Sequence, residues 1–100
     1  MNTVRAIVKW IVESKLDTLR ALSNAELSDL PGTSDDMFLD GRAGKLHVYR
    51  DYLAGSHRII VQAYLKSLSG FGAIVIPSGF LIDGNGARRD LREDEMYDFT

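Results

Sequence analysis

The sequence predicts an α+β fold: a twisted antiparallel β-meander of about five strands from residue 37 to 89, with N-terminal helices packed on one face and a short C-terminal helix. Two observations lead to this prediction. From Met37 onward, segments rich in β-branched and aromatic residues alternate with short turn-forming segments. A single pairing scheme also places the apolar residues of each hairpin on one face of the sheet. We therefore expect residues 1–100 to form one domain.

The longest hairpin sets the pairing scheme. Residues 45–53 and 58–66 are predicted strands, and a two-residue type II′ turn at Gly55-Ser56 brings Ala54 opposite His57. Counting outward from this turn gives an apolar face, the core face, formed by Leu46, Val48, Tyr52, Ile59, Val61, Ala63 and Leu65. The opposite face, the outer face, carries Lys45, His47, Tyr49, Asp51, Arg58, Gln62, Tyr64 and Lys66, with Ile60 as its aliphatic member.

Three further turns extend the meander on both sides of this hairpin. Turns at residues 41–44 and 69–70 add strands that continue the apolar face. The resulting core-face pairs are Leu39 with Leu46, Met37 with Val48, Ile74 with Leu65 and Ile76 with Ala63. A turn at residues 78–79 then places Leu81 on the core face and Ile82 on the outer face.

The C-terminal segment begins with a turn at residues 83–86, which are residue types that tolerate positive φ. Residues 87–89 follow as a short return strand. Asp90 and Glu93 have the spacing of a capping box, which predicts a short helix through Met96. The acidic residues fall in the first turn of this helix, where its dipole favours them.

The N-terminal third permits two interpretations. Residues 3–13 alternate apolar and charged side chains, which favours a strand followed by a new helix that begins at Ser14. The alternative is one continuous helix with an apolar stripe through Val4, Ile7, Val8, Ile11 and Leu22. Lys15 falls in the middle of that stripe, so we prefer strand then helix. Ser23 with Glu26 predicts a second short helix, and residues 31–36 are expected to form a loop.

Composition excludes several classes of protein. The chain has no cysteine, so disulfides, thiolate metal sites and thiol catalysis are excluded. Charged residues interrupt every apolar run before it reaches the length of a membrane span or a signal peptide. The formal charge of −2 disfavours a dedicated nucleic-acid binder. We expect a soluble, cytoplasmic protein.

No motif predicts catalysis, a cofactor or a metal site. His47 and His57 lie far apart in the pairing scheme and on opposite faces, so they do not share an ion. Asp83 and Asn85 resemble the start of a calcium loop, but Arg88 stands where that loop needs glycine. We therefore predict that the protein is not an enzyme and uses no cofactor.

Arg50 is the one charged residue on the predicted core face. A buried, unpaired guanidinium is costly, so Arg50 needs a partner. One expectation is that it lies at the rim and pairs with an acid such as Asp17 or Glu26. The other is that it contacts a bound anion.

The outer face is the predicted interaction surface because it combines basic, aromatic and apolar side chains. Its candidate residues are Lys45, His47, Tyr49, Gln62, Tyr64, Lys66, Phe71, Val75 and Ile82. The C-terminal helix, a second copy of the chain or a different partner would cover it. We expect a non-catalytic interaction module that forms a homodimer through this face. The alternative is binding of RNA or single-stranded nucleic acid, with Tyr49 and Tyr64 stacking on bases and Lys45, Arg58 and Lys66 on phosphates.

Overall fold

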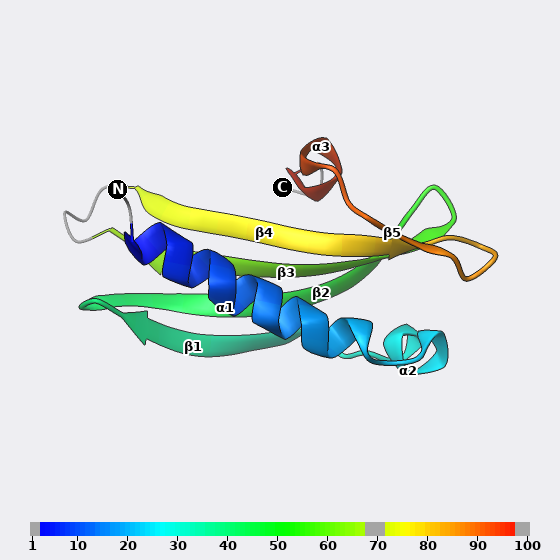
Figure 1. Ribbon diagram of the computed structural model, residues 1–100, viewed down its shortest axis with the longest axis horizontal. Helices are drawn as coiled ribbons and strands as arrows, with labels where there is room; N and C mark the ends of the chain where they lie inside the picture. The colour runs from blue at the N-terminus through cyan, green and yellow to red at the C-terminus, as the bar shows by residue number, and fades with distance from the viewer. Residues whose placement is uncertain (1–2, 68–71, 98–100) are drawn as a thin grey trace.

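The protein is an α+β meander, as the sequence predicted (Figure 1). A computed structural model describes residues 3–67 and 72–97. Its elements are α1 (Thr3–Arg20), α2 (Asn24–Ser28), β1 (Thr33–Leu39), β2 (Arg42–Leu53), β3 (Ser56–Lys66), β4 (Ala73–Ile82), β5 (Arg88–Asp90) and α3 (Glu93–Tyr97). The strands form one sheet in the order β1-β2-β3-β4-β5, and every neighbouring pair is antiparallel.

The N-terminal segment is one continuous helix, so the expected strand over residues 3–13 is wrong. Val8, Val12 and Leu16 are fully buried and recur every fourth residue, which places them on one helical stripe against the sheet. Burial of this stripe outweighs the β-propensity of its β-branched residues. Lys15 is half-buried rather than central to the stripe, and Ser14 lies inside the helix. α1 crosses the strands diagonally (Figure 1).

The second helix forms as predicted. The Ser23 hydroxyl accepts a hydrogen bond from the Glu26 backbone N–H (3.1 Å), and the Glu26 carboxylate accepts one from the Ser23 N–H (3.0 Å). Hydrogen bonds from Ser23 to this carboxylate, chiefly the one from its backbone N–H and then one from its side chain, lower the pKa of Glu26. The expected loop at residues 31–36 is only partly correct, because β1 begins at Thr33.

The β2–β3 hairpin turns one residue earlier than predicted. Ala54 (φ 51°) and Gly55 (φ 82°) both adopt positive φ, as in a type I′ turn, so Leu53 faces Ser56. The pairing is therefore displaced by two residues, and His57 lies opposite Tyr52. Because the displacement is even, the assignment of side chains to the two faces survives.

The β1–β2 hairpin is displaced in the same way. Its turn is Asp40-Gly41, both with positive φ, and Leu39 faces Arg42 instead of Leu46. The displacement is four residues, which again preserves the faces. It also brings Asp36 opposite Lys45, and the opposite charges of these two side chains attract across the strands.

β4 passes straight through the expected turn at residues 78–79, which does not exist. Its pairing of Ile74 with Leu65 is as predicted, although the preceding turn lies outside the described residues. Gly79 serves close packing, because a Cβ there would collide with the carbonyl oxygen of Ile59 on β3. Without the turn, the last residues of β4 exchange faces relative to the prediction, so Leu81 points to the outer face and Ile82 to the core.

Two hydrophobic clusters lie on opposite sides of the sheet. The larger one fills the space between the sheet and the N-terminal helices; its buried members are Val8, Val12, Leu16, Leu19, Leu27, Val48, Ile59, Val61, Ala63, Leu65, Phe80 and Ile82. The smaller one lies on the outer face, where Leu91 and Met96 pack on Ile60 and Leu81. The C-terminal segment therefore covers one end of the outer face.

Candidate interaction surface

The pairing of the strands brings most of the predicted interaction residues together on the outer face. Two rows of outward side chains cross the sheet: Asp36, Lys45, Tyr64 and Val75 in one, and Ser34, His47, Gln62 and Pro77 in the next. We use the name exposed patch for Phe38, Lys45, His47, Tyr49, Gln62, Tyr64 and Lys66. We use the name covered end for Asp51, Arg58, Ile60, Leu81, Arg89, Leu91, Glu95 and Met96.

Aromatic rings dominate the exposed patch. Phe38 is 74% exposed, Tyr64 38% and Tyr49 37%. The ring of His47 stacks on that of Tyr49, with centroids 5.6 Å apart and an interplanar angle of 25°. Aromatic residues are among the residue types that are enriched at protein interfaces.

The cations of the outer face are largely neutralised within the chain. Lys45 Nζ lies 2.6 Å from Asp36 Oδ1, and the hydrogen bond from this ammonium lowers the pKa of Asp36. Arg58 is only 4% exposed and binds Asp51 through two nitrogens, with Nε–Oδ1 at 2.8 Å and an Nη–Oδ2 distance of 2.6 Å. Of the three basic residues predicted to bind phosphate, Lys45 is exposed but ion-paired, and Arg58 is buried. Only Lys66 is both exposed and without an ion pair among residues 3–67 and 72–97.

The covered end is closed by ion pairs of the C-terminal segment. Arg89 donates two hydrogen bonds to the buried carboxylate of Glu95 (2.8 and 2.7 Å), and the backbone N–H of Arg92 donates a third (2.9 Å). The hydrogen bonds from Arg89, then that from Arg92, hold the pKa of Glu95 at about 2. The expected capping residue Asp90 instead pairs with Arg20 on α1 (3.0 Å). α3 thus begins two residues later than its capping pattern suggested.

Not every predicted interaction residue lies in the exposed patch. Val75, on β4, is half-buried on the outer face. Phe71 lies outside the described residues. Ile82 is 6% exposed and belongs to the core, which corrects its assignment to the surface. Phe38 is the patch residue that the candidate set omitted, although its outward direction follows from the alternation of β1.

Arg50 lies on the core face, half-buried, as the strand alternation predicts. Its Nε donates to the carbonyl oxygen of Leu30 (3.2 Å), in the segment that follows α2. Within the described part of the chain neither proposed carboxylate pairs with it; Asp17 binds Arg20 instead. The guanidinium is thus partly satisfied by a backbone acceptor.

The described residues contain neither a metal site nor a membrane-spanning helix. Among residues 3–67 and 72–97, no group of His, Cys, Asp and Glu side chains is arranged to hold a metal ion. In the same ranges, no helix is both long and apolar enough to cross a membrane. No family model, no curated protein and no solved structure matches this chain.

Proposed function

We propose that this protein is a non-catalytic interaction module that forms a homodimer through the exposed patch. The observation that carries the proposal is that exposed rings lie on a sheet face where Lys45 and Arg58 are already paired with acids of the chain, which leaves Lys66 as the unpaired cation among the described residues of this face. Desolvating such a surface gains the burial of apolar area without leaving many charges unpaired. An open sheet face of this kind suits an isologous contact, in which the same patch serves both copies.

A two-fold axis parallel to the strands, between β2 and β3, gives complementary contacts. In that arrangement Lys45 lies over Tyr64 of the second copy, because these residues share a row on adjacent strands. His47 lies over Gln62 of the second copy for the same reason. The first contact is a cation–π pair and the second a hydrogen bond, so neither places like charges together.

Nucleic acid is the less supported partner for this face. Phosphate binding needs several free cations, and its strength depends on how many phosphates are neutralised. Arg58 is buried against Asp51, and Lys45 is paired with Asp36, so two of the three expected phosphate contacts are already occupied. The remaining patch is too weakly basic for the usual electrostatic footprint.

Solution mass as a function of concentration tests the dimer. We expect sedimentation equilibrium to show the mass of two chains in the wild type and of one chain in Tyr64→Glu, with unchanged circular dichroism. Tyr52→Glu is the matched control, because Tyr52 is also exposed (64%) but points to the opposite face of the same hairpin. Its dimerisation should be unchanged.

A wild-type protein that stays monomeric at millimolar concentration would refute self-association. A fluorescent single-stranded RNA, titrated at low and then at higher salt, decides the next step. Binding that weakens steeply with salt would replace the dimer by the nucleic-acid function.

A further inference from the structure

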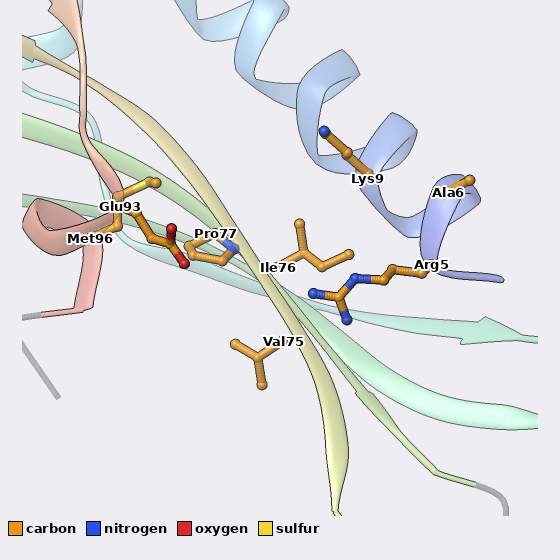
Figure 2. A pocket seen from close by; sticks show the side chains of 8 residues that line it. All are labelled: Arg5, Ala6, Lys9, Val75, Ile76, Pro77, Glu93 and Met96. Carbon is orange, nitrogen blue, oxygen red and sulfur yellow. The ribbon is translucent and has the colours of Figure 1, made fainter. Parts of the chain in front are cut away.

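The outer edge of β4 is open over most of its length. β5 pairs only with Phe80–Ile82, and within the described chain residues 73–78 have no strand partner on that side. A groove of about 540 Å³ runs beside this edge. Arg5 and Lys9 of α1 form one wall, Glu93 and Met96 form the other, and β4 lies between them (Figure 2).

The backbone groups of β4 that face the groove can be assigned from one hydrogen bond. The carbonyl oxygen of Gly79 accepts from the N–H of Leu91 (3.0 Å), so Gly79 points toward the outer edge. Backbone groups of alternate residues in a strand point to the same edge, so Val75 and Pro77 face the groove as well. Val75 therefore offers an N–H and a C=O, while Pro77 offers a C=O only.

The two walls of the groove differ in charge. α1 lies on the core-face side of β4, where Lys9 is exposed and the guanidinium of Arg5 lies near Ile76 (Figure 2). The other wall is formed on the outer-face side by the carboxylate of Glu93 and the thioether of Met96. A strand added to this edge would direct alternate side chains to the two walls.

We propose that the open edge of β4 binds a short extended peptide as an additional strand, with acidic side chains at every second position. These acids face the basic wall of α1, and the residues between them, apolar or basic, face Met96 and Glu93. Main-chain hydrogen bonds to Val75 and Pro77 supply affinity, and the opposite character of the walls supplies specificity. This site is separate from the exposed patch and goes beyond the proposed dimer.

A second copy of β4 fits this edge less well than a peptide does. Two copies paired edge to edge about a two-fold axis normal to the sheet would bring both α1 helices to the same side. Arg5 and Lys9 of each copy would then approach those of the other, which is unfavourable. Pro77 also removes a donor from the middle of the edge, a recognised obstacle to long strand pairing. A peptide with the opposite charge avoids the repulsion between the basic walls, and a short one has few main-chain bonds to lose at Pro77.

The probe is the blocked hexapeptide acetyl-Glu-Val-Glu-Lys-Glu-Val-amide, whose three acids share one side when it is extended. Its first control is acetyl-Glu-Glu-Glu-Val-Val-Lys-amide, which has the same composition without the alternation. Its second control carries N-methyl groups along the backbone, which removes the main-chain donors. We expect titration calorimetry to show at least about tenfold weaker binding for each control.

Amide hydrogen exchange locates the site independently of affinity. The N–H of Val75 faces the groove, whereas that of Ile76 faces β3. Binding of the hexapeptide should therefore slow exchange at Val75 and leave Ile76 unchanged. Slowing at Val75 that depends on protein concentration without peptide would assign the edge to a second copy, and would overturn the proposal.

Substitution of the basic wall completes the test. Lys9→Glu should weaken binding of the hexapeptide by about tenfold or more, because a favourable charge pair becomes a repulsive one. Lys45→Glu makes the same change in net charge on β2, away from the groove, and should bind the peptide normally. Tyr64→Glu should also bind normally, which separates this proposal from the dimer. Equal affinity for all three peptides, or an unaffected Lys9→Glu variant, would rule the peptide site out.

Discussion

The two ends of the outer face are built on the same strands but are completed differently. At the covered end, the C-terminal segment packs Leu91 and Met96 on the sheet and closes over a buried arginine, Arg58. At the exposed patch, no described helix is packed, and rings such as Phe38 remain in solvent. The covered end therefore contributes to folding of the chain, whereas the exposed patch is open to solvent, as the proposed dimer requires.

The ion pairs of the two ends differ in the same way: those of the covered end each include a buried side chain, and that of the exposed patch lies in solvent. Glu95 is buried and its carboxylate is held by Arg89 and Arg92, so its negative charge is part of the fold. The Lys45–Asp36 pair of the exposed patch is short but lies in solvent, with side chains 52% and 87% exposed. Exposed pairs of this type contribute little to stability. Substitutions at the covered end should therefore lower stability, and those at the exposed patch should alter association.

Substitution of Arg58 should have the largest effect on the stability of the fold. Arg58→Ala removes a buried guanidinium that binds Asp51 through two nitrogens and donates to the carbonyl oxygen of Glu95 in the C-terminal segment. The Asp51 carboxylate left behind is 42% exposed, so we expect the free energy of unfolding to fall by about 2 kcal/mol, mainly from the lost hydrogen bonds to charged groups. Urea denaturation measures it. A loss below about 0.5 kcal/mol would mean that the covered end is not a cooperative part of the fold.

The two faces of β3 provide the next comparison. Val61 is fully buried on the core face, so Val61→Ala should destabilise by ~1–3 kcal/mol. Gln62, its neighbour on the outer face, is half-exposed, and Gln62→Ala should change stability by under about 0.5 kcal/mol. The same denaturation experiment applies to both variants. The reverse order would show that the faces are exchanged.

Acid should loosen the covered end through Glu95. The pKa of Glu95 is lowered from an unfolded value of 4.5 to about 2 in the fold, chiefly by Arg89. A group with a depressed pKa stabilises the fold fully above its unfolded pKa, and this contribution disappears as pH falls through the folded pKa. Glu95→Gln should therefore have a lower melting temperature than the wild type at pH 7. The difference between the two melting temperatures should narrow as the pH falls from about 4.5 to 2. A difference in melting temperature that does not change with pH would show that the ion pairs of Glu95 are not its cause.

Substitution of Arg50, on the face opposite the patch, should have only a small effect on stability. Its one hydrogen bond among the described residues is to the Leu30 carbonyl, so Arg50→Leu should be within about 1 kcal/mol of the wild type in either direction. Phosphate should raise the melting temperature of both proteins equally. A response confined to the wild type would establish Arg50 as an anion contact.

Turn chemistry explains why the observed strand pairing differs from the predicted pairing. Asp40-Gly41 and Ala54-Gly55 are two-residue turns with positive φ, and the first has a recognisable Asp-Gly signal. Ala54 is a poor sequence signal for this conformation, because residues with a side chain seldom adopt it. Direct pairing of Asp51 with Arg58 accompanies the observed register. Local preference for a glycine-led turn was thus outweighed by cross-strand contacts.

The candidate patch was largely readable from the sequence because side chains alternate along strands. His47, Tyr49, Gln62 and Tyr64 keep their predicted face despite the displaced pairing, since both displacements are even. Ile82 was misplaced because the expected turn before it does not form. The groove beside β4 was not predicted, because it depends on where α1 and α3 lie relative to an open sheet edge.

The sequence by itself determined the meander, the two faces of its strands and the capped helix α2, because these depend on alternation and on contacts between near neighbours. Only the tertiary structure decided that residues 3–13 are helical, since a segment with both periodicities takes the one that buries its apolar stripe. It also decided how far the C-terminal segment covers the outer face and leaves the edge of β4 open. Those outcomes depend on packing between segments that are distant in sequence, which no local pattern encodes.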